Sequence, residues 1–158
     1  MKIRVLCVGR KDPEWLSAGV AEYRRRLPPH LPIEQVTIPP SKHAARNAAD
    51  QQKIIAEEGE RILQQIDRSD WVVALDERGK MRSSRELAAR LDDWSIAGHS
   101  VVFVVGGVNG LAPAVMDRSN EKMSLSTLTF PHHLVRLILV EALYRAWTIN
   151  AGHPYHRD

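Results

Sequence analysis

Short apolar runs alternate along the chain with longer segments whose apolar residues recur at helical spacing. Four runs are short, strongly apolar and bounded by turn residues, which is typical of buried strands: 3–9, 31–38, 70–76 and 100–107. A fifth, shorter strand is expected within 123–130. The segments between the strands have the spacing of amphipathic helices: 12–27, 51–66 and 83–94.

The expected helices carry recognisable start signals. Asp12 precedes Pro13, so Asp12 is expected to cap the first helix and Pro13 to occupy its first turn. Ser83 stands three residues before Glu86, the pattern of a capping box. A last helix is predicted over 131–149, again with proline at its start. Its apolar residues occupy nearly every face, which indicates burial on several sides and favours a subunit interface.

Strands that alternate with helices predict an α/β fold with a mostly parallel sheet flanked by helices. The length of 158 residues suits one domain spanning 1–158. The single cysteine, Cys7, lies in an apolar run and excludes an internal disulfide, which fits a cytoplasmic protein. No secretory signal or membrane span is predicted. The pI of about 9.2 hints at an acidic partner such as nucleic acid.

A glycine-rich loop follows the most apolar strand. Gly106, Gly107 and Gly110 would let backbone N–H groups approach a ligand closely. The pattern is neither the dinucleotide fingerprint nor a phosphate loop with its lysine. A tight turn between strand and helix explains the glycines somewhat better, so the loop alone does not identify a ligand.

Small hydroxyl residues are crowded ahead of the last helix: Ser124, Ser126, Thr127 and Thr129. Such a stretch offers donors and acceptors to a small polar ligand, whereas capping of the helix would explain only one of the four. His132 falls in the first helical turn, where the helix N-terminus favours the neutral imidazole. A neutral imidazole can accept a proton.

The end of the chain gathers further reactive groups. Arg145 lies four residues after Glu141, so the two are expected either to pair or to leave Arg145 facing an anion. Tyr155, His156 and Arg157 together can stack a base and clamp a phosphate. The histidine and cysteine spacing indicates no metal site, and no serine occupies a nucleophile elbow.

The string SLSTLTFPHHLVRLILVEALYRAWTI, followed by a terminal HPYHRD and preceded by ALD…GK and VGG..G, resembles the ribosomal large-subunit pseudouridine N3-methyltransferases. The resemblance runs from VGRKDPEW to the final YHRD. It implies a SPOUT-type α/β fold with a C-terminal trefoil knot, and a homodimer. It also implies transfer of a methyl group from S-adenosylmethionine to N3 of a pseudouridine in 23S ribosomal RNA, on the assembled ribosome.

The resemblance also assigns residues. The implied cofactor cradle consists of Leu75, Gly106, Leu125, Ser126, Thr127, Leu128, Thr129 and Phe130. The implied substrate-handling and catalytic residues are His132, Arg145, Tyr155, His156 and Arg157. Either His132 or His156 would take the N3 proton, and either Arg145 or Arg157 would offset negative charge. Two positions depart from the family pattern: Val108 stands where proline is usual, and Ala142 where glutamine is common.

Two other functions compete with this interpretation. A small nucleotide-binding enzyme would use the glycine loop for a phosphate, although the lysine of a phosphate loop is missing. A ribosome-binding factor without enzymatic activity would explain the basic pI. It would leave the hydroxyl-rich stretch beside an apolar strand unexplained.

Overall fold

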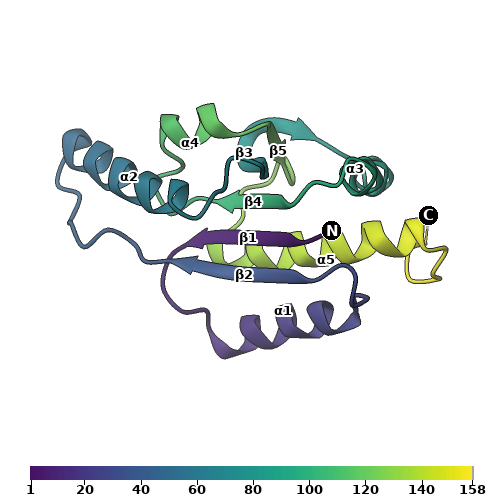
Figure 1. The fold of residues 1–158 in the computed structure, drawn as a ribbon. Coiled ribbons are helices and arrows are strands. Elements are labelled where there is room, and N and C mark those ends of the chain that lie inside the picture. The colour runs from purple at the N-terminus through teal and green to yellow at the C-terminus, as the bar shows by residue number, and fades with distance from the viewer. Residues whose placement is uncertain (158) are drawn as a thin grey trace.

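The computed structural model describes residues 1–157 and contains a five-stranded sheet (Figure 1). The strands are β1 (Ile3–Val8), β2 (Ile33–Ile38), β3 (Trp71–Met81), β4 (Val101–Val105) and β5 (Glu121–Ser124). Their order is β2-β1-β4-β3-β5, and every neighbouring pair is parallel. The predicted parallel α/β architecture is therefore confirmed, and all the carboxyl ends of the strands meet at one edge.

Helices cover both faces of the sheet. Helices α1 (Glu14–Arg26), α3 (Ser84–Ile96) and α5 (His132–Asn150) pack on one face, where Phe103 and Trp94 lie in the core. Helices α2 (Ala48–Leu63) and α4 (Pro113–Arg118) pack on the other, around Ile62 and Val104. In Figure 1, α5 starts beside the arrowheads of β1 and β4 and ends beside α3, at the opposite side of the molecule. The first turn of α5 thus lies at the carboxyl edge of the sheet.

Three strands and four helices lie close to their predicted ranges, and the structure differs from the prediction in three places. The fifth strand was expected within 123–130, but it covers Glu121–Ser124 because only this stretch pairs with β3. Helix α4, with six residues, is too short to show a helical period. Strand β3 continues to Met81, well past its predicted end at residue 76.

Of the two capping predictions, the one at Ser83 is confirmed and the one at Asp12 is wrong. Ser83 and Glu86 form the reciprocal capping box, with Ser83 Oγ accepting from the Glu86 amide at 3.1 Å. Asp12 does not cap α1: Pro13 occupies the N-cap position and no side chain caps the helix. The Asp12 carboxylate accepts hydrogen bonds from Arg136 and Gln35 instead, because stronger charged partners lie within its reach.

Strand β3 contains the main irregularity of the sheet. Leu75 and Lys80 both pair with Met123 of β5, so the residues between them are looped out of the ladder. Gly79 permits this shape, because a Cβ there would lie 2.6 Å from the Met123 backbone nitrogen. The looped-out residues include Asp76, Glu77 and Arg78, which the bulge directs away from the regular strand.

Cys7 is fully buried in the core, where desolvation raises the pKa of its thiol to about 12. Within residues 1–157, no helix has both the length and the apolar character needed to span a lipid bilayer. No group of three or more histidine, cysteine or acidic side chains in the same range could hold a metal ion.

Candidate functional site

A cavity of about 640 Å³ opens at the carboxyl edge of the sheet. Four segments line it: the bulge of β3, the loop after β4, the loop after β5 and the first turn of α5. In parallel α/β folds this edge is where ligands bind, because the loops that follow the strands converge there. The volume lies in the range of small-molecule sites. The fold therefore places the two loops singled out in the sequence around one pocket.

The loop after β4 is a tight turn that forms one wall of the pocket. The Gly110 amide donates to the Gly107 carbonyl at 3.1 Å, and Gly110 has a φ of +88°, a conformation that favours glycine. A Cβ on Gly106 would lie 3.1 Å from Gly110 and from the side chain of Leu111. Gly106 is thus needed for the loop to close on itself, while Val108 at the tip is exposed.

The loop after β5 is held by its own hydroxyl groups. Ser124 Oγ donates to the Ser126 carbonyl at 3.0 Å, and Ser126 Oγ accepts from the Leu128 amide at 2.9 Å. None of the four hydroxyl residues caps α5, whose N-cap is Pro131. The alternative explanation of this stretch as a helix cap is therefore excluded. The bonds of Ser124 and Ser126 fix a loop without regular structure along the pocket wall.

The bulge of β3 brings charge to the pocket. The Arg78 amide donates to Asp76 Oδ1 at 2.8 Å, and Arg78 Nε donates to the same oxygen at 3.2 Å. These bonds, the side-chain bond foremost, lower the pKa of Asp76, so this carboxylate stays charged at neutral pH. Glu77 lies beside it, so this side of the cavity carries two carboxylates and one guanidinium, and its excess of negative charge suits a cationic ligand group.

His132 forms the pocket wall at the start of α5. Its pKa is lowered chiefly by desolvation, and further by the neighbouring His133 and Arg136. The rings of His132 and His133 lie 4.1 Å apart between centroids. His132 is consequently neutral at pH 7, the form expected from its place in the first helical turn and the form that can accept a proton.

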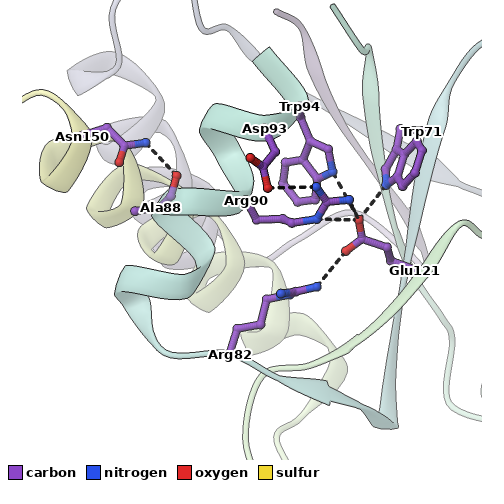
Figure 2. A network of polar contacts seen from close by, with 8 residues as sticks. All are labelled: Trp71, Arg82, Ala88, Arg90, Asp93, Trp94, Glu121 and Asn150. Carbon is purple, nitrogen blue, oxygen red and sulfur yellow. Dashed lines mark hydrogen bonds and ion pairs between the residues drawn. The ribbon is translucent and has the colours of Figure 1, made fainter. Parts of the chain in front are cut away.

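A half-buried charge network anchors β5, from which the hydroxyl-rich loop departs (Figure 2). Glu121 Oε1 accepts from Arg90 Nε at 2.8 Å and from Trp71 Nε1 at 2.9 Å, and Trp94 Nε1 also reaches this oxygen. Arg82 donates to the second carboxylate oxygen at 3.1 Å. Glu121 thus ties β5 to β3 and α3, which fixes where the following loop begins.

The remaining predicted residues gather at the other end of α5. Glu141 Oε1 accepts from Arg145 Nε at 3.0 Å and from the Tyr155 hydroxyl at 3.0 Å. The Arg145 guanidinium also lies over the Tyr155 ring, 4.9 Å from its centroid. The predicted Glu141–Arg145 pair is confirmed, and Tyr155 folds back onto α5, where its ring also meets that of Tyr144.

The structure therefore divides the predicted site residues into two groups. Seven of the eight predicted cradle residues line the pocket together with His132, and Thr127 of the same loop does not. Arg145, Tyr155, His156 and Arg157 lie outside it. Arg145 stands roughly 20 Å along α5 from His132, at 1.5 Å per residue. Within one chain, the two groups do not form one site.

Several groups that line the pocket were not predicted as site residues. Asp76, Glu77 and Arg78 belong to the bulge, and Val105, Met123 and Val135 provide apolar wall. A useful signal was present in ALDERGK, where charged residues follow a buried strand before a glycine.

Two basic clusters in the sequence are typical of a solvated surface, but they would form a phosphate track if they lay on one face: Arg24, Arg25 and Arg26, and Arg78, Lys80, Arg82 and Arg85. Several of these arginines are bonded within the fold. Arg25 and Arg26 pair with Glu22, and Arg24 Nε donates to the Ile33 carbonyl at 2.7 Å. In the second cluster, Arg82 pairs with Glu121. These bonds favour structural roles over a continuous phosphate track.

A parallel sheet with a pocket at its carboxyl edge, walled by a glycine turn and a hydroxyl-rich loop, defines a small-molecule-binding α/β protein of the methyltransferase type. Residues 1–156 match the family described as predicted SPOUT methyltransferases. The chain belongs to this family, and its members are enzymes that transfer methyl groups. The trefoil knot typical of the family stays a prediction.

Individual relatives span the whole chain. A protein of Paracidovorax citrulli named ribosomal RNA large subunit methyltransferase H is 44% identical over 158 residues, which is all of both chains. A protein of the same name from Hahella chejuensis is also 44% identical over the full length of both. The crystal structure of a methylase family protein from Neisseria gonorrhoeae superposes with a TM-score of 0.54 at 13% identity, covering 99% of this chain and 86% of that one, which supports the fold alone.

Proposed function

We propose that this protein methylates N3 of a pseudouridine in 23S ribosomal RNA of the assembled ribosome, with S-adenosylmethionine as the methyl donor. The observation that carries the proposal is the pocket itself: a cavity of about 640 Å³ with a neutral histidine at its wall. Full-length relatives named as large-subunit ribosomal RNA methyltransferases support the substrate class. The reaction would take place in the cytoplasm, where ribosomes are found.

The residues of the pocket fit S-adenosylmethionine, the donor used in this family. Leu75, Val105 and Met123 offer apolar surface for the adenine ring. The polar loops after β4 and β5 offer backbone and hydroxyl partners for the ribose. Asp76 and Glu77 would offset the cationic sulfonium and ammonium groups. When bound, the cofactor supplies a methyl group on a sulfonium, which a nucleophilic nitrogen can accept.

The protein would contribute positioning, proton transfer and charge. N3 of pseudouridine belongs to a weakly acidic imide, so its proton must be removed as the nitrogen is methylated. His132 is neutral and lies at the pocket wall, which qualifies it to take this proton. Holding the base in line with the methyl group would supply much of the rate. His156 is the second histidine with a claim to this role.

The separation of the two residue groups along α5 supports a homodimer with shared sites. Within one chain, Arg145 and Tyr155 are too far from the pocket to meet its ligand. In a two-fold dimer, these groups from a second copy would close the pocket, with Arg145 or Arg157 offsetting negative charge and Tyr155 stacking on the base. Half-buried apolar side chains on α5, including Leu137, Ile138 and Trp147, provide surface for such an interface.

Methyl transfer to ribosomes is the direct test. Ribosomes with pseudouridine at the target position should accept labelled methyl groups, and ribosomes with uridine there should accept far fewer. Calorimetric titration with S-adenosylmethionine should show binding to the protein alone. Equal labelling of both ribosomes would refute the pseudouridine specificity.

The competing functions predict other results in the same experiments. A nucleotide-binding enzyme would bind ATP or NAD in the titration and not S-adenosylmethionine. A ribosome-binding factor without activity would bind ribosomes and transfer no methyl group.

A further inference from the structure

A buried ion pair lies beside His132, and neither of its two residues lines the pocket. Arg136, one helical turn after His132, is 1% exposed and pairs with Asp12 of the loop between β1 and α1. The side chain of Asp12 is 8% exposed. Burial of two charges is costly unless their positions serve a purpose or their bonds are well satisfied.

The bonds of Arg136 are incomplete. Its second guanidinium nitrogen donates to the Val8 carbonyl at 3.2 Å. Its Nε atom is buried and makes no hydrogen bond to any residue in 1–157. Such an arrangement is a poor way to gain stability, since an apolar side chain of similar volume would avoid the desolvation cost. The presence of this ion pair in the interior is therefore not explained by packing alone.

The pair also fixes the surroundings of His132. Gly9 has a φ of +149°, and a Cβ there would lie 2.9 Å from the Arg136 guanidinium and 3.8 Å from His132 Nε2. Both side chains thus lie against the backbone at the end of β1. His133 Nδ1 lies 3.4 Å from Asp12 Oδ1, and its ring stacks on His132. Asp12 consequently contacts both His133 and Arg136, the two charged or titratable side chains of α5 that act on His132.

We propose that Asp12 and Arg136 are positioning residues for His132: they hold the first turn of α5 against the end of β1 and set the charge that His132 experiences. This proposal rests on the role of His132 in the proposed methyl transfer. It extends that role by naming the residues that keep the imidazole ready to accept a proton.

The charges that act on His132 come from two elements. Arg136 and His133 of α5 disfavour its protonated form, while Asp12 of the β1–α1 loop favours it. The remaining charged groups of the pocket are Asp76, Glu77 and Arg78 in the bulge of β3. The two members of the ion pair therefore act on His132 in opposite directions, although each is needed for the same pair.

Because Arg136 and Asp12 act in opposite directions on the pKa of His132, substituting each one distinguishes a positioning role from a purely structural role. Arg136→Met and Asp12→Asn both break the pair, so both should destabilise the fold. Arg136→Met should raise the pKa of His132, because the repelling cation is gone and Asp12 is left unopposed. Asp12→Asn should lower it. Structural loosening alone would move the pKa of His132 in the same direction in both variants.

The measurement is an NMR titration of the histidine ring protons in the apo protein, with the His132 signal assigned by its loss in His132→Ala. Arg68→Met and Asp117→Asn remove one exposed charge each, far from His132, and should leave its titration unchanged. Shifts of the same sign in the two pair variants, or no shifts, would overturn the proposal. Should one variant fail to fold, the other decides: a shift opposite to the one stated for it, or no shift, refutes the charge assignment.

Activity gives a second readout. The acid limb of the methyl-transfer pH profile should move to higher pH in Arg136→Met and to lower pH in Asp12→Asn. Because the titration requires no substrate, it stands even when the proposed reaction fails. Opposite NMR shifts without any shift of the acid limb would show that the pair controls His132 but that His132 is not the base.

Discussion

Gly79 lies so close to Met123 that a methyl group on Gly79 would fall 2.6 Å from the Met123 backbone nitrogen. The neighbouring carbonyl carbon of Lys122 would be 2.7 Å away. Backbone atoms cannot give way as a flexible side chain can. This contact is what allows β3 to bulge while keeping its pairing with β5, and the bulge carries Asp76 to Arg78 into the pocket.

Gly79→Ala should therefore open the β3–β5 pairing at the pocket. We expect a loss of several kcal/mol in the free energy of unfolding, because overpacking against backbone is among the costly substitutions. S-adenosylmethionine affinity should fall as well. Urea unfolding and calorimetry measure the two effects. Gly98→Ala is a useful control, since a Cβ there meets nothing within 4 Å and its backbone strain is the only cost. Equal stability losses in both variants would contradict the backbone clash.

Gly106→Val tests the loop after β4. A Cβ at this position would already press on Gly110 and Leu111 at 3.1 Å, and two more methyl groups would force the turn apart. Binding of S-adenosylmethionine should be abolished, which means a loss of affinity of at least about a hundredfold, or ~2.7 kcal/mol. Gly106→Ala should give a smaller loss in calorimetric titration. Ala114→Val, on the exposed side of α4, adds two methyl groups at the surface and should leave the affinity unchanged. Wild-type affinity in Gly106→Val would remove this turn from the binding site.

Glu121→Gln tests the network that anchors β5. The substitution keeps the shape but removes the anion shared by Arg82 and Arg90, and leaves Arg90 only its bond to Asp93 at 3.3 Å. We expect a cost of about 2 kcal/mol in the free energy of unfolding. Urea denaturation at neutral pH measures the loss. Glu60→Gln removes an exposed carboxylate and should change stability little. A loss no larger than that of the Glu60 control would show that the network contributes nothing to stability.

The contribution of Glu121 to the free energy of unfolding should also depend on pH, and it should decrease as the pH falls. Burial alone would raise its pKa, but the bonds from Arg90, Trp71 and Trp94 together outweigh burial and lower it below 4.5. A carboxylate whose pKa is lower in the folded state stabilises the fold above its unfolded pKa and loses this effect as pH falls. The stability difference between wild type and Glu121→Gln should therefore be full above pH 4.5 and shrink below it. A difference that grows on acidification would contradict the assignment.

Deletion of residues 155–158 tests the shared site. Tyr155 packs on the surface of α5, so the truncated protein should fold, dimerise and keep much of its cofactor affinity, while methyl transfer should be lost. The dimer itself should be visible by light scattering at micromolar concentration.

Mixing the truncated protein with Gly106→Val sharpens this test. If sites are shared across a two-fold axis, about half of randomly exchanged dimers are mixed and roughly a quarter of all sites are intact. Activity should then reappear from two inactive proteins. If the tail of each chain acts in the pocket of its own chain, every site contains either the deletion or the Gly106→Val substitution, and the mixture stays inactive. No recovery, with exchange verified by mass spectrometry, would rule out sharing.

The sequence predicted those features that depend on short segments. Buried strands, the capping box at Ser83 and the start of the last helix follow from local composition and spacing. The two pocket loops were also recognised, because their glycine and hydroxyl residues stand out against the apolar strands beside them. Their shared location follows from parallel topology, which places all carboxyl ends at one edge.

Other features depend on contacts between distant residues and left no local signal. The bulge of β3 exists because Leu75 and Lys80 both pair with Met123, which no window of sequence reveals. Asp12 looked like a helix cap because caps are judged from neighbours alone. Its actual partner, Arg136, lies on the last helix and is brought near only by the fold. The end of β5 at Ser124 is likewise decided by its pairing with β3.

The 19-residue helix α5 has one consequence for how activity is switched on. A continuous helix behaves as a rigid spacer, so no bending of one chain can carry Arg145 or Tyr155 to His132. With shared sites, a lone chain would possess every reactive group and still be latent. Specific activity would then fall on dilution, following the dissociation curve of the dimer. Newly synthesised chains would be inactive until they dimerise.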